Sequence, residues 1–313
     1  MTCKVEVRFL PIYELLDSLL VFSHPSFHKK TEMGLDWRKR IIKKIGSDFT
    51  DSLNPDHVGL LSDYILTQPV FNLSINQWLE QLAQTSSNEV TDHLQYLSRT
   101  GTEKYASFVE SFEKTLQLVM KWKEKYFDQL DPAMISALEE DCLQKKEQIP
   151  HYTPLDFIEK VTNGFVLTGF DDVQKIILHP ACHSSPIVTY SHYKHLHIYG
   201  YPVDISPIPD EEPSSGLIQK GICLSDKNRL KILRFLGNEE KSFTDIVKFI
   251  GLAKSTVHHH MVHLRASGLV QIILSPTATE RYRLREQGLE TIFQNYHQYL
   301  FSNEKLHPIS EFD

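Results

Sequence analysis

The sequence predicts a mainly α-helical protein with small β-sheets (an α+β chain), in which a large helical domain precedes a smaller C-terminal domain. Three observations support this prediction. Apolar residues recur at helical spacing through most of the first 160 residues, and short strand-like segments follow between residues 173 and 199. A stretch rich in Pro, Ser and acidic residues, 204–215, then separates the two domains. With 313 residues, of which 41% are hydrophobic, the chain is long enough for two domains with real cores.

The N-terminal domain is expected to open with a strand at Lys4–Phe9, because its residues alternate between apolar and charged. Helical patterns then continue as far as residue 161. We predict helices at residues 11–22, 37–45, 57–66, 75–83, 90–98, 103–130, 133–148 and 155–161. The longest of these carries an aromatic-rich stripe at helical spacing, which is more typical of core packing than of a ligand pocket.

Three strands are expected next, at residues 173–178, 186–190 and 195–199, with the last two forming a hairpin. Four histidines form a candidate cluster: His183, His192, His195 and His197. His195 and His197 are two residues apart on the third strand, so both face the same side in a geometry compatible with metal ligation. The alternative interpretation is a pair of surface histidines on an exposed sheet face. We favour that alternative and predict no metal and no cofactor.

The C-terminal domain is expected to begin with an amphipathic helix, 221–236. Leu230, Leu233 and Leu236 form its apolar face. Either Ser225 or Asp226 can cap a helix here, and Gly237 followed by Asn238 is a typical helix end.

Residues 244–268 are the most informative segment for function. They read as two short helices that are joined by a tight turn at Gly251. In the second helix, a buried stripe is formed by Val257, Met261 and Leu264. The residues that lie mainly off this stripe are Lys254, Ser255, His258, His259 and Val262. Hydrogen-bond donors at the exposed start of a short second helix are what a helix-turn-helix inserts into the major groove of DNA.

Two strands follow this segment, at residues 269–274 and 280–284, and the connecting sequence SPTAT is a turn. A strand, a turn and a strand after a recognition helix form a wing, so the C-terminal domain is predicted to be a winged helix-turn-helix. Thr277 and Thr279 lie near the tip of the wing, and Arg281 and Arg283 share one strand face. We expect these four residues to contact the DNA backbone or minor groove; the alternative is an ordinary solvated hairpin.

The segment resembles the winged helix of the ArsR-type bacterial regulators, and the matching residues occur in order at 224–233, 251–252, 255–259 and 264–270. The resemblance implies that Lys254, Ser255, His258 and His259 face the bases. Ala253 departs from the Ser that family members often carry before the recognition helix. If Ser255 capped the helix instead, the helix would start later and the base-facing assignment would shift. The order of elements in the N-terminal domain resembles, more weakly, that of larger ArsR-type regulators from Gram-positive bacteria, and it implies no ligand.

The charge distribution agrees with a DNA-binding C-terminal domain. Residues 217–285 contain twelve Lys or Arg and five Asp or Glu, a net charge of +7, whereas the whole chain has a net charge of −7. Positive charge is therefore concentrated in one domain, as expected for a surface that contacts phosphates. A solvated basic face without a partner is the alternative interpretation.

Several other classes of protein are disfavoured. The four cysteines are scattered without a C-x-x-C pair, which fits a reducing cytoplasm, and no apolar run approaches the length of a membrane-spanning helix. No signal peptide is recognised. Phosphate-binding glycine loops and hydrolase motifs are missing, so we predict no enzymatic activity. The run His258–His260 points in three directions on a helix and cannot chelate one ion.

We therefore predict a cytoplasmic bacterial transcription regulator, a repressor that binds a palindromic operator in double-stranded DNA as a homodimer. The expected domains are a sensor or dimerisation domain (1–205), a linker (206–216), the winged helix-turn-helix (217–285) and a dimerising C-terminal helix (286–313). The role of the N-terminal domain leaves room for a small-molecule inducer of unknown identity. The alternative function is a protein-interaction or dimerisation module without operator activity.

Overall fold

A computed structural model describes residues 3–24, 27, 30–31, 33–70, 72–97, 103–205 and 212–301 of the chain, which divides into two compact units. Unit 1 comprises Met1–Phe157 and Phe170–Ile205, and unit 2 comprises Ile158–Gly169 and Ser206–Asp313. The division differs in one respect from a simple boundary near residue 205. The short segment Ile158–Gly169 folds with the C-terminal residues, so the chain passes between the units three times.

Unit 1 contains the helices that the periodicity predicts, with bounds that differ by a few residues. They are α1 (Pro11–Ser23), α2 (Gly34–Ile45), α3 (Ser47–Ser52), α4 (Pro55–Thr67), α5 (Ile75–Gln84), α6 (Ser87–Leu97), α7 (Glu103–Lys125), α8 (Pro132–Gln148) and the first half of α9 (Pro154–Val161). Local signals set the helix starts: a Pro stands at the first position of α1, α4 and α8, and Ser74 and Gln77 form a capping box on α5. Helix α3 was not predicted, because six residues are too few to show a period.

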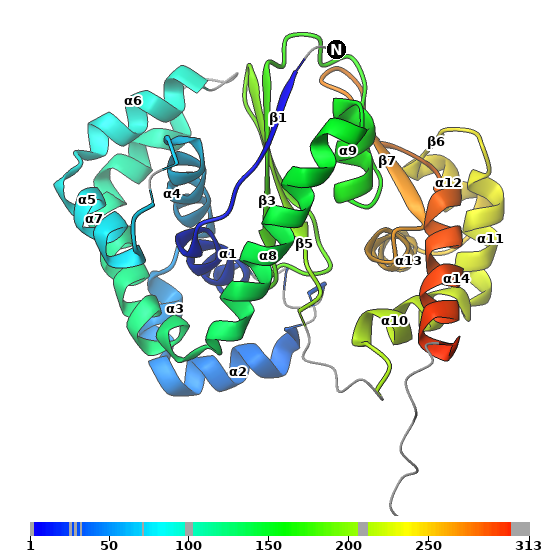
Figure 1. Ribbon diagram of the computed structural model, residues 1–313, viewed down its shortest axis with the longest axis horizontal. Helices are drawn as coiled ribbons and strands as arrows, with labels where there is room; N and C mark the ends of the chain where they lie inside the picture. Colours follow the sequence, from blue (N-terminus) through cyan, green and yellow to red (C-terminus); the bar gives the residue numbers. More distant parts are fainter. Residues whose placement is uncertain are drawn as a thin grey trace, which may run out of the picture. The chain divides into compact units, whose positions relative to one another are not determined.

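The sheet of unit 1 lies beside these helices, and its strands follow the order β1-β3-β5-β4 (Figure 1). The strands are β1 (Lys4–Val7), β3 (Lys175–Ala181), β4 (Thr189–His192) and β5 (Leu196–Pro202). The first three in sheet order run parallel, and β4 pairs antiparallel with β5, which confirms the predicted hairpin.

Side chains alternate between the two faces of this sheet. Ile177 and Ile198 belong to the apolar core that α1, α4 and α7 share, whereas Tyr201 points to the other face and donates a hydrogen bond to Asp141 on α8 over 2.7 Å. Because successive strand residues face opposite sides, the sheet is covered by the helical bundle on one face and by α8 on the other.

The aromatic stripe of α7 is core, as the sequence analysis predicted. Its members are at most 5% exposed: Phe108, Phe112, Leu116, Val119 and Trp122. The indole of Trp122 donates to Ser18 Oγ on α1 over 2.9 Å, so the one polar atom of this large side chain is satisfied inside the core.

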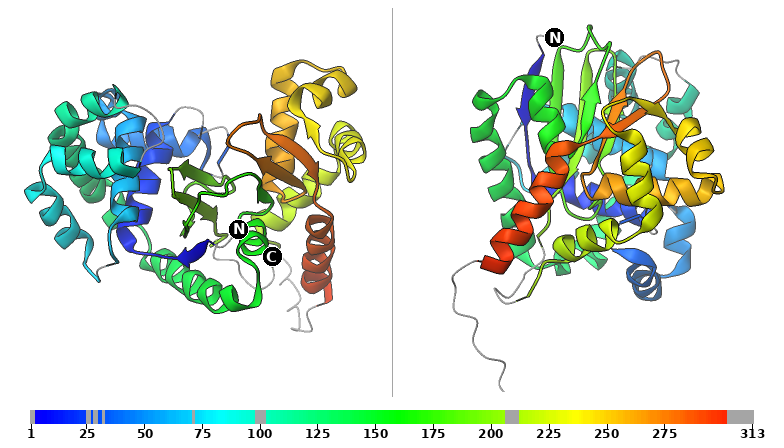
Figure 2. Two further views of the ribbon diagram at one scale, coloured as in Figure 1. Left: turned by 90° about the horizontal axis from the view of Figure 1, so that it is seen from above. Right: turned by 90° about the vertical axis from the view of Figure 1, so that its right-hand side faces the viewer.

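Unit 2 is the winged helix with flanking helices. Its elements are β2 (Phe165–Leu167), α10 (Ser215–Leu224), α11 (Lys227–Leu236), β6 (Lys241–Ser242), α12 (Phe243–Ile250), α13 (Lys254–Ala266), β7 (Val270–Leu274), β8 (Arg281–Leu284) and α14 (Glu286–Phe301). The second sheet has the order β2-β7-β8-β6, in which β7 and β8 are the antiparallel pair predicted as the wing. Figure 2 shows this hairpin beside the helices of unit 2.

The helix expected over residues 221–236 is in fact two helices. Helix α10 ends at Leu224, and the Asp226 carboxylate then caps α11 by accepting the backbone N–H groups of Asn228 and Arg229 at 2.9 Å each. The apolar face was also misassigned in one position. Ile232, Leu233 and Leu236 are buried, but Leu230 is 48% exposed, because α11 turns that position towards solvent.

Strand β2 was not predicted, and it extends the sheet of the wing. It pairs parallel with β7, placing Phe165 opposite Ile272. Gly164, which precedes it, has a φ of +123°, and a Cβ there would lie 2.7 Å from the carbonyl oxygen of Val270. Only glycine allows the backbone to approach β7 this closely.

A buried ion pair holds the same segment in place. Glu159 Oε1 lies 2.7 Å from Arg285 Nε, and both side chains are largely buried. Gln271 donates a second hydrogen bond to the same carboxylate oxygen over 3.2 Å. The segment 158–169 is thus bound to the wing through side chains as well as through its strand.

None of the helices in the part of the chain that the structure describes combines the length and hydropathy needed to span a lipid bilayer.

Candidate nucleic-acid interface

Helices α12 and α13 form the predicted two-helix motif. Ser242 and Asp245 form a capping box at the start of α12, and Gly251 ends that helix in the left-handed conformation with a φ of 71°. This conformation turns the chain sharply into α13, and glycine adopts it without steric cost. The geometry confirms the predicted helix, tight turn and helix.

The buried face of α13 is the one predicted. Val257, Met261 and Leu264 are at most 3% exposed, and His260 joins them at 9%. His260 Nδ1 lies 3.8 Å from Asp226 Oδ1, the capping carboxylate of α11. Apolar packing and this polar contact together fix the rotation of α13 about its axis, and therefore which side chains face outward.

The predicted base-facing residues lie on the opposite side of α13. Lys254, Ser255, His258 and His259 are exposed, and Val262 is half-buried. The first four belong to the first two turns of the helix, where the macrodipole is positive and attracts phosphate. The structure therefore brings four of the five predicted residues together as one exposed, donor-rich surface.

Ala253 stands at the N-cap of α13 and makes no side-chain cap hydrogen bond. Ser255 does not replace it, because α13 begins at Lys254 and Ser255 lies within the first turn. The register used for the base-facing assignment is therefore the one in the structure. A helix without a capping side chain also leaves its first backbone N–H groups accessible to an anion.

A histidine pair on α13 was not predicted. His259 Nε2 and His263 Nε2 lie 3.1 Å apart, because residues four apart on a helix stack on one face. Burial, and then the neighbouring His259, lower the pKa of His263. The i, i+4 spacing of the two histidines is the sequence signal for this pair.

The four predicted residues of the wing differ in their surroundings. Thr277 and Thr279 are exposed on the β7–β8 turn, in agreement with their expected position at the tip. Arg283 is half-buried and donates to Gln271 Oε1 over 2.9 Å, whereas Arg281 donates to the carbonyl oxygen of Glu240 over 2.7 Å. Both guanidinium groups already have partners within unit 2, so DNA contact through them requires sharing or exchanging these hydrogen bonds.

The comparison with protein families gives one match on this unit. Residues 226–271 match the model of the bacterial regulatory proteins of the arsR family. The chain carries an ArsR-family helix-turn-helix domain. The match starts at the cap of α11 and ends within β7, so it covers both helices of the motif and the beginning of the wing. A DNA-binding regulator is the general function of such a domain.

No curated protein and no solved structure matches the chain significantly. The ArsR-family domain is therefore the part with a recognised relationship, and a large region precedes it.

The two candidate metal ligands, His195 and His197, lie in different surroundings. His195 precedes β5, is exposed, and its Nδ1 lies 2.9 Å from the carbonyl oxygen of Asp172. His197 is fully buried and stacks on His192, with ring centroids 4.0 Å apart. The structure brings His197 together with His192 and Tyr199, away from an exposed sheet face, because β4 pairs His192 directly opposite His197.

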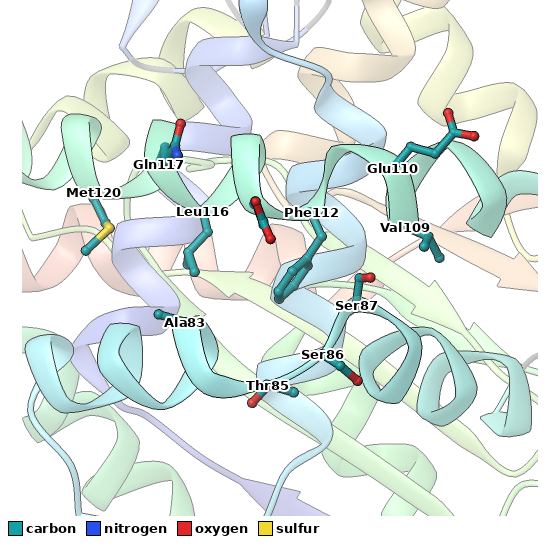
Figure 3. Close-up of a pocket in the computed structure, with 11 residues that line it drawn as sticks. Ala83, Thr85, Ser86, Ser87, Val109, Glu110, Phe112, Leu116, Gln117 and Met120 are labelled. Atoms are coloured by element: carbon teal, nitrogen blue, oxygen red, sulfur yellow. The ribbon is translucent and has the colours of Figure 1, made fainter.

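Unit 1 has a partly open groove between the helix pair α5–α6 and α7, with a volume of about 600 Å³ (Figure 3). Phe112 and Leu116 form its buried floor, and Glu110 and Glu113 add carboxylates at its edge. Its size is within the range of small-molecule sites. Sequence reasoning had assigned Phe112 and Leu116 to the core, which is correct, because the groove exposes little of either side chain.

Proposed function

We propose that the protein is a bacterial transcription repressor that binds a palindromic operator as a homodimer. The observation that carries the proposal is the exposed start of α13, where Lys254, Ser255, His258 and His259 stand over a buried apolar stripe within an ArsR-family domain. In the proposed complex this helix lies in the major groove, and Thr277 and Thr279 of the wing lie against the backbone or minor groove.

The proposed homodimer matches the two half-sites of the proposed palindromic operator. Two copies of α13 related by a two-fold axis match half-sites about 34–36 Å apart. Helices α10 and α14 supply apolar surface for such a contact: Ile222 is 48% exposed on α10 and Phe293 is 62% exposed on α14. The two helices pack together, and Tyr296 donates to the carbonyl oxygen of Leu217 over 2.9 Å.

Unit 1 is the proposed sensor. An inducer would act by binding the DNA-competent and the DNA-incompetent arrangements with unequal affinity. The groove beside α7 is the candidate place for a small molecule.

We expect binding to the DNA upstream of the protein's own gene to fall by about 10³–10⁵ between 50 and 200 mM salt. This range corresponds to about six to ten phosphate contacts, which the exposed Lys and Arg side chains of two C-terminal domains can supply. The measurement is a fluorescence-anisotropy titration across a salt series, together with a footprint. Weak, sequence-independent binding at all salt concentrations would favour the alternative, an interaction module without operator activity.

We expect the Ile222→Glu and Phe293→Glu variants to be monomeric at concentrations where the wild type is a dimer, because a charge in an apolar interface loses its hydration. Analytical ultracentrifugation measures the change in mass. Leu143→Glu is the matched control, since Leu143 is 56% exposed on α8 of unit 1. A monomeric wild type, or variants that remain dimeric, would contradict this interface.

A further inference from the structure

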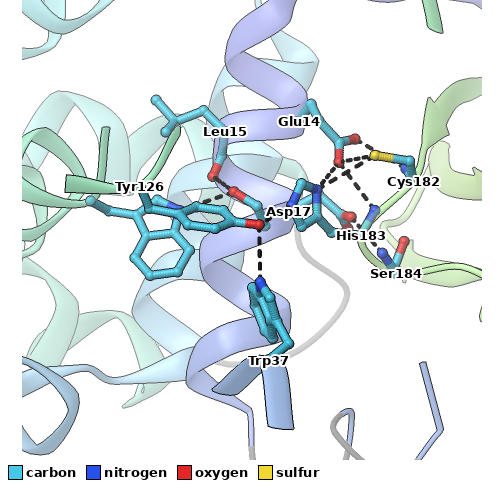
Figure 4. A network of polar contacts seen from close by, with 10 residues as sticks. Glu14, Leu15, Asp17, Trp37, Tyr126, Cys182, His183 and Ser184 are labelled. Atoms are coloured by element: carbon cyan, nitrogen blue, oxygen red, sulfur yellow. Dashed lines mark hydrogen bonds and ion pairs between the residues drawn. The ribbon is translucent and has the colours of Figure 1, made fainter. Parts of the chain in front are cut away.

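A buried cluster of unlike polar groups joins α1 to the loop that follows β3. Glu14 Oε1 accepts the Cys182 thiol over 2.9 Å and the backbone N–H of His183 over 3.1 Å, and it also contacts His183 Nδ1 directly (Figure 4). Glu14 and His183 are at most 2% exposed. Cys182 and His183 follow Glu14 by 168 and 169 residues in the sequence, yet the three side chains meet at one point.

The other ring nitrogen of His183, Nε2, also has a hydrogen-bond partner. His183 Nε2 lies 2.7 Å from Tyr126 Oη, and that oxygen accepts the indole N–H of Trp37 over 3.1 Å. The imidazole ring is therefore fixed with Nδ1 turned towards Glu14 and Cys182. A ring held through one nitrogen, with the other presented to a common point, is the usual arrangement of a metal-ligating histidine.

A purely structural role explains this cluster poorly. Asp17, one turn after Glu14 on α1, is also buried, and its carboxylate accepts the Ser184 N–H over 3.0 Å. Burial, and then the charge of Glu14, raise the pKa of Asp17 well above its usual value. Apolar side chains would join α1 to this loop without desolvating two carboxyl groups and a thiol.

We propose that Glu14, Cys182 and His183 form a binding site for a zinc ion in unit 1. Their three donor atoms lie within 4.8 Å of one another, and they offer one oxygen, one sulfur and one nitrogen. Zinc accepts this mixed set in tetrahedral geometry, whereas magnesium and calcium select oxygen ligands alone. Three protein ligands leave a fourth position for water or another small ligand.

The distances fit with a small adjustment. With zinc–nitrogen bonds of about 2.0 Å and zinc–sulfur bonds of about 2.3 Å, tetrahedral ligands put sulfur and nitrogen about 3.5 Å apart. Cys182 Sγ and His183 Nδ1 are 3.5 Å apart. Glu14 Oε1 is closer to both, so its carboxylate must withdraw by roughly 0.5–1 Å to reach these ligand spacings, a movement that its own side-chain torsions supply.

Charge also balances at the site. Glu14 accepts hydrogen bonds from the Cys182 thiol and from the His183 backbone N–H, as a carboxylate does. On zinc binding, Cys182 releases its proton to solvent and becomes a thiolate, and His183 binds through unprotonated Nδ1 while Nε2–H donates to Tyr126. One dication with one carboxylate and one thiolate makes a neutral buried group.

The test uses the full-length protein, freed of metal with a chelator and titrated with Co²⁺ as a spectroscopic probe for zinc. We expect one equivalent to bind and to produce a thiolate-to-cobalt charge-transfer band, which added Zn²⁺ abolishes. Cys182→Ser should lose the band, and Cys142→Ser, which changes another buried thiol of unit 1, should keep it. Tyr126→Phe should weaken zinc binding by about 10–100-fold, because it removes the acceptor of His183 Nε2–H.

The proposal is overturned if the folded wild type binds no stoichiometric Co²⁺, or if the band survives Cys182→Ser. Should Cys182→Ser fail to fold, X-ray absorption of the zinc-loaded wild type decides, since a coordination shell without one sulfur at about 2.3 Å also overturns it. The site does not depend on operator binding, so these outcomes are independent of the proposed function.

Discussion

Replacing Lys254 with Ala is expected to weaken operator binding by roughly 30-fold to 10⁴-fold. The range follows from about 1–3 kcal/mol for each lost contact, counted twice in a homodimer, with 1.4 kcal/mol for each factor of ten. Lys254 is the first residue of α13 and is fully on its exposed side, so the substitution leaves the buried stripe intact. His258→Ala, one turn later on the same helix, should have an effect in the same range.

The salt dependence of these variants separates two roles. Loss of a phosphate contact weakens binding to all sequences and lowers the salt slope by about one for each half-site, whereas loss of a base contact relaxes sequence preference and leaves the slope unchanged. Lys114→Ala is the control, because it removes one positive charge from an exposed position of α7 in unit 1. If Lys254→Ala and His258→Ala both bind the operator like the wild type, the face of α13 assigned to DNA is wrong.

Glu159→Ala is expected to lower the free energy of unfolding of unit 2 by about 3–5 kcal/mol. The substitution leaves the guanidinium of Arg285 buried without its carboxylate, and an uncompensated buried charge costs this much. It also removes the acceptor of Gln271, which lies on the central strand β7 of the wing. Urea unfolding that is followed by far-ultraviolet circular dichroism measures the effect.

The chain supplies controls for this experiment. Glu139→Ala removes an exposed carboxylate from α8 and should change stability by less than about 0.5 kcal/mol. The three tryptophans, Trp37, Trp78 and Trp122, all belong to unit 1, so tryptophan fluorescence reports that unit separately. A Glu159→Ala protein as stable as the wild type would show that β2 and Gly164, rather than the ion pair, hold the segment 158–169 in unit 2.

Within α13, the sequence was sufficient because the information is local. Val257, Met261 and Leu264 recur at helical spacing, so the buried stripe and the outward position of Lys254 and His258 follow from one period. The wing hairpin was also predicted correctly, because strand alternation and a turn sequence are local signals as well. The break between α10 and α11 is also set by a local signal, the Asp226 cap, although the apolar pattern continues on both sides of it.

The histidines show where pattern reasoning failed. His195 and His197 share a strand parity, yet the strand begins after His195, so only His197 is packed into the sheet. Its true neighbour, His192, depends on the register of the β4–β5 hairpin, which spacing along one strand does not reveal.

Apart from α3 and the break between α10 and α11, local sequence patterns were enough to predict the helices of both units, the ArsR-family motif, the basic character of the C-terminal domain and the face of α13 that looks outward. Tertiary structure decided the rest: the return of residues 158–169 to unit 2, the Glu159–Arg285 pair, and the meeting of Glu14 with Cys182 and His183. Helical periods and caps act over a few residues and can be read along the chain. Contacts between residues more than a hundred positions apart depend on how all the elements pack, because each buried polar group takes whichever partner the packing brings within reach.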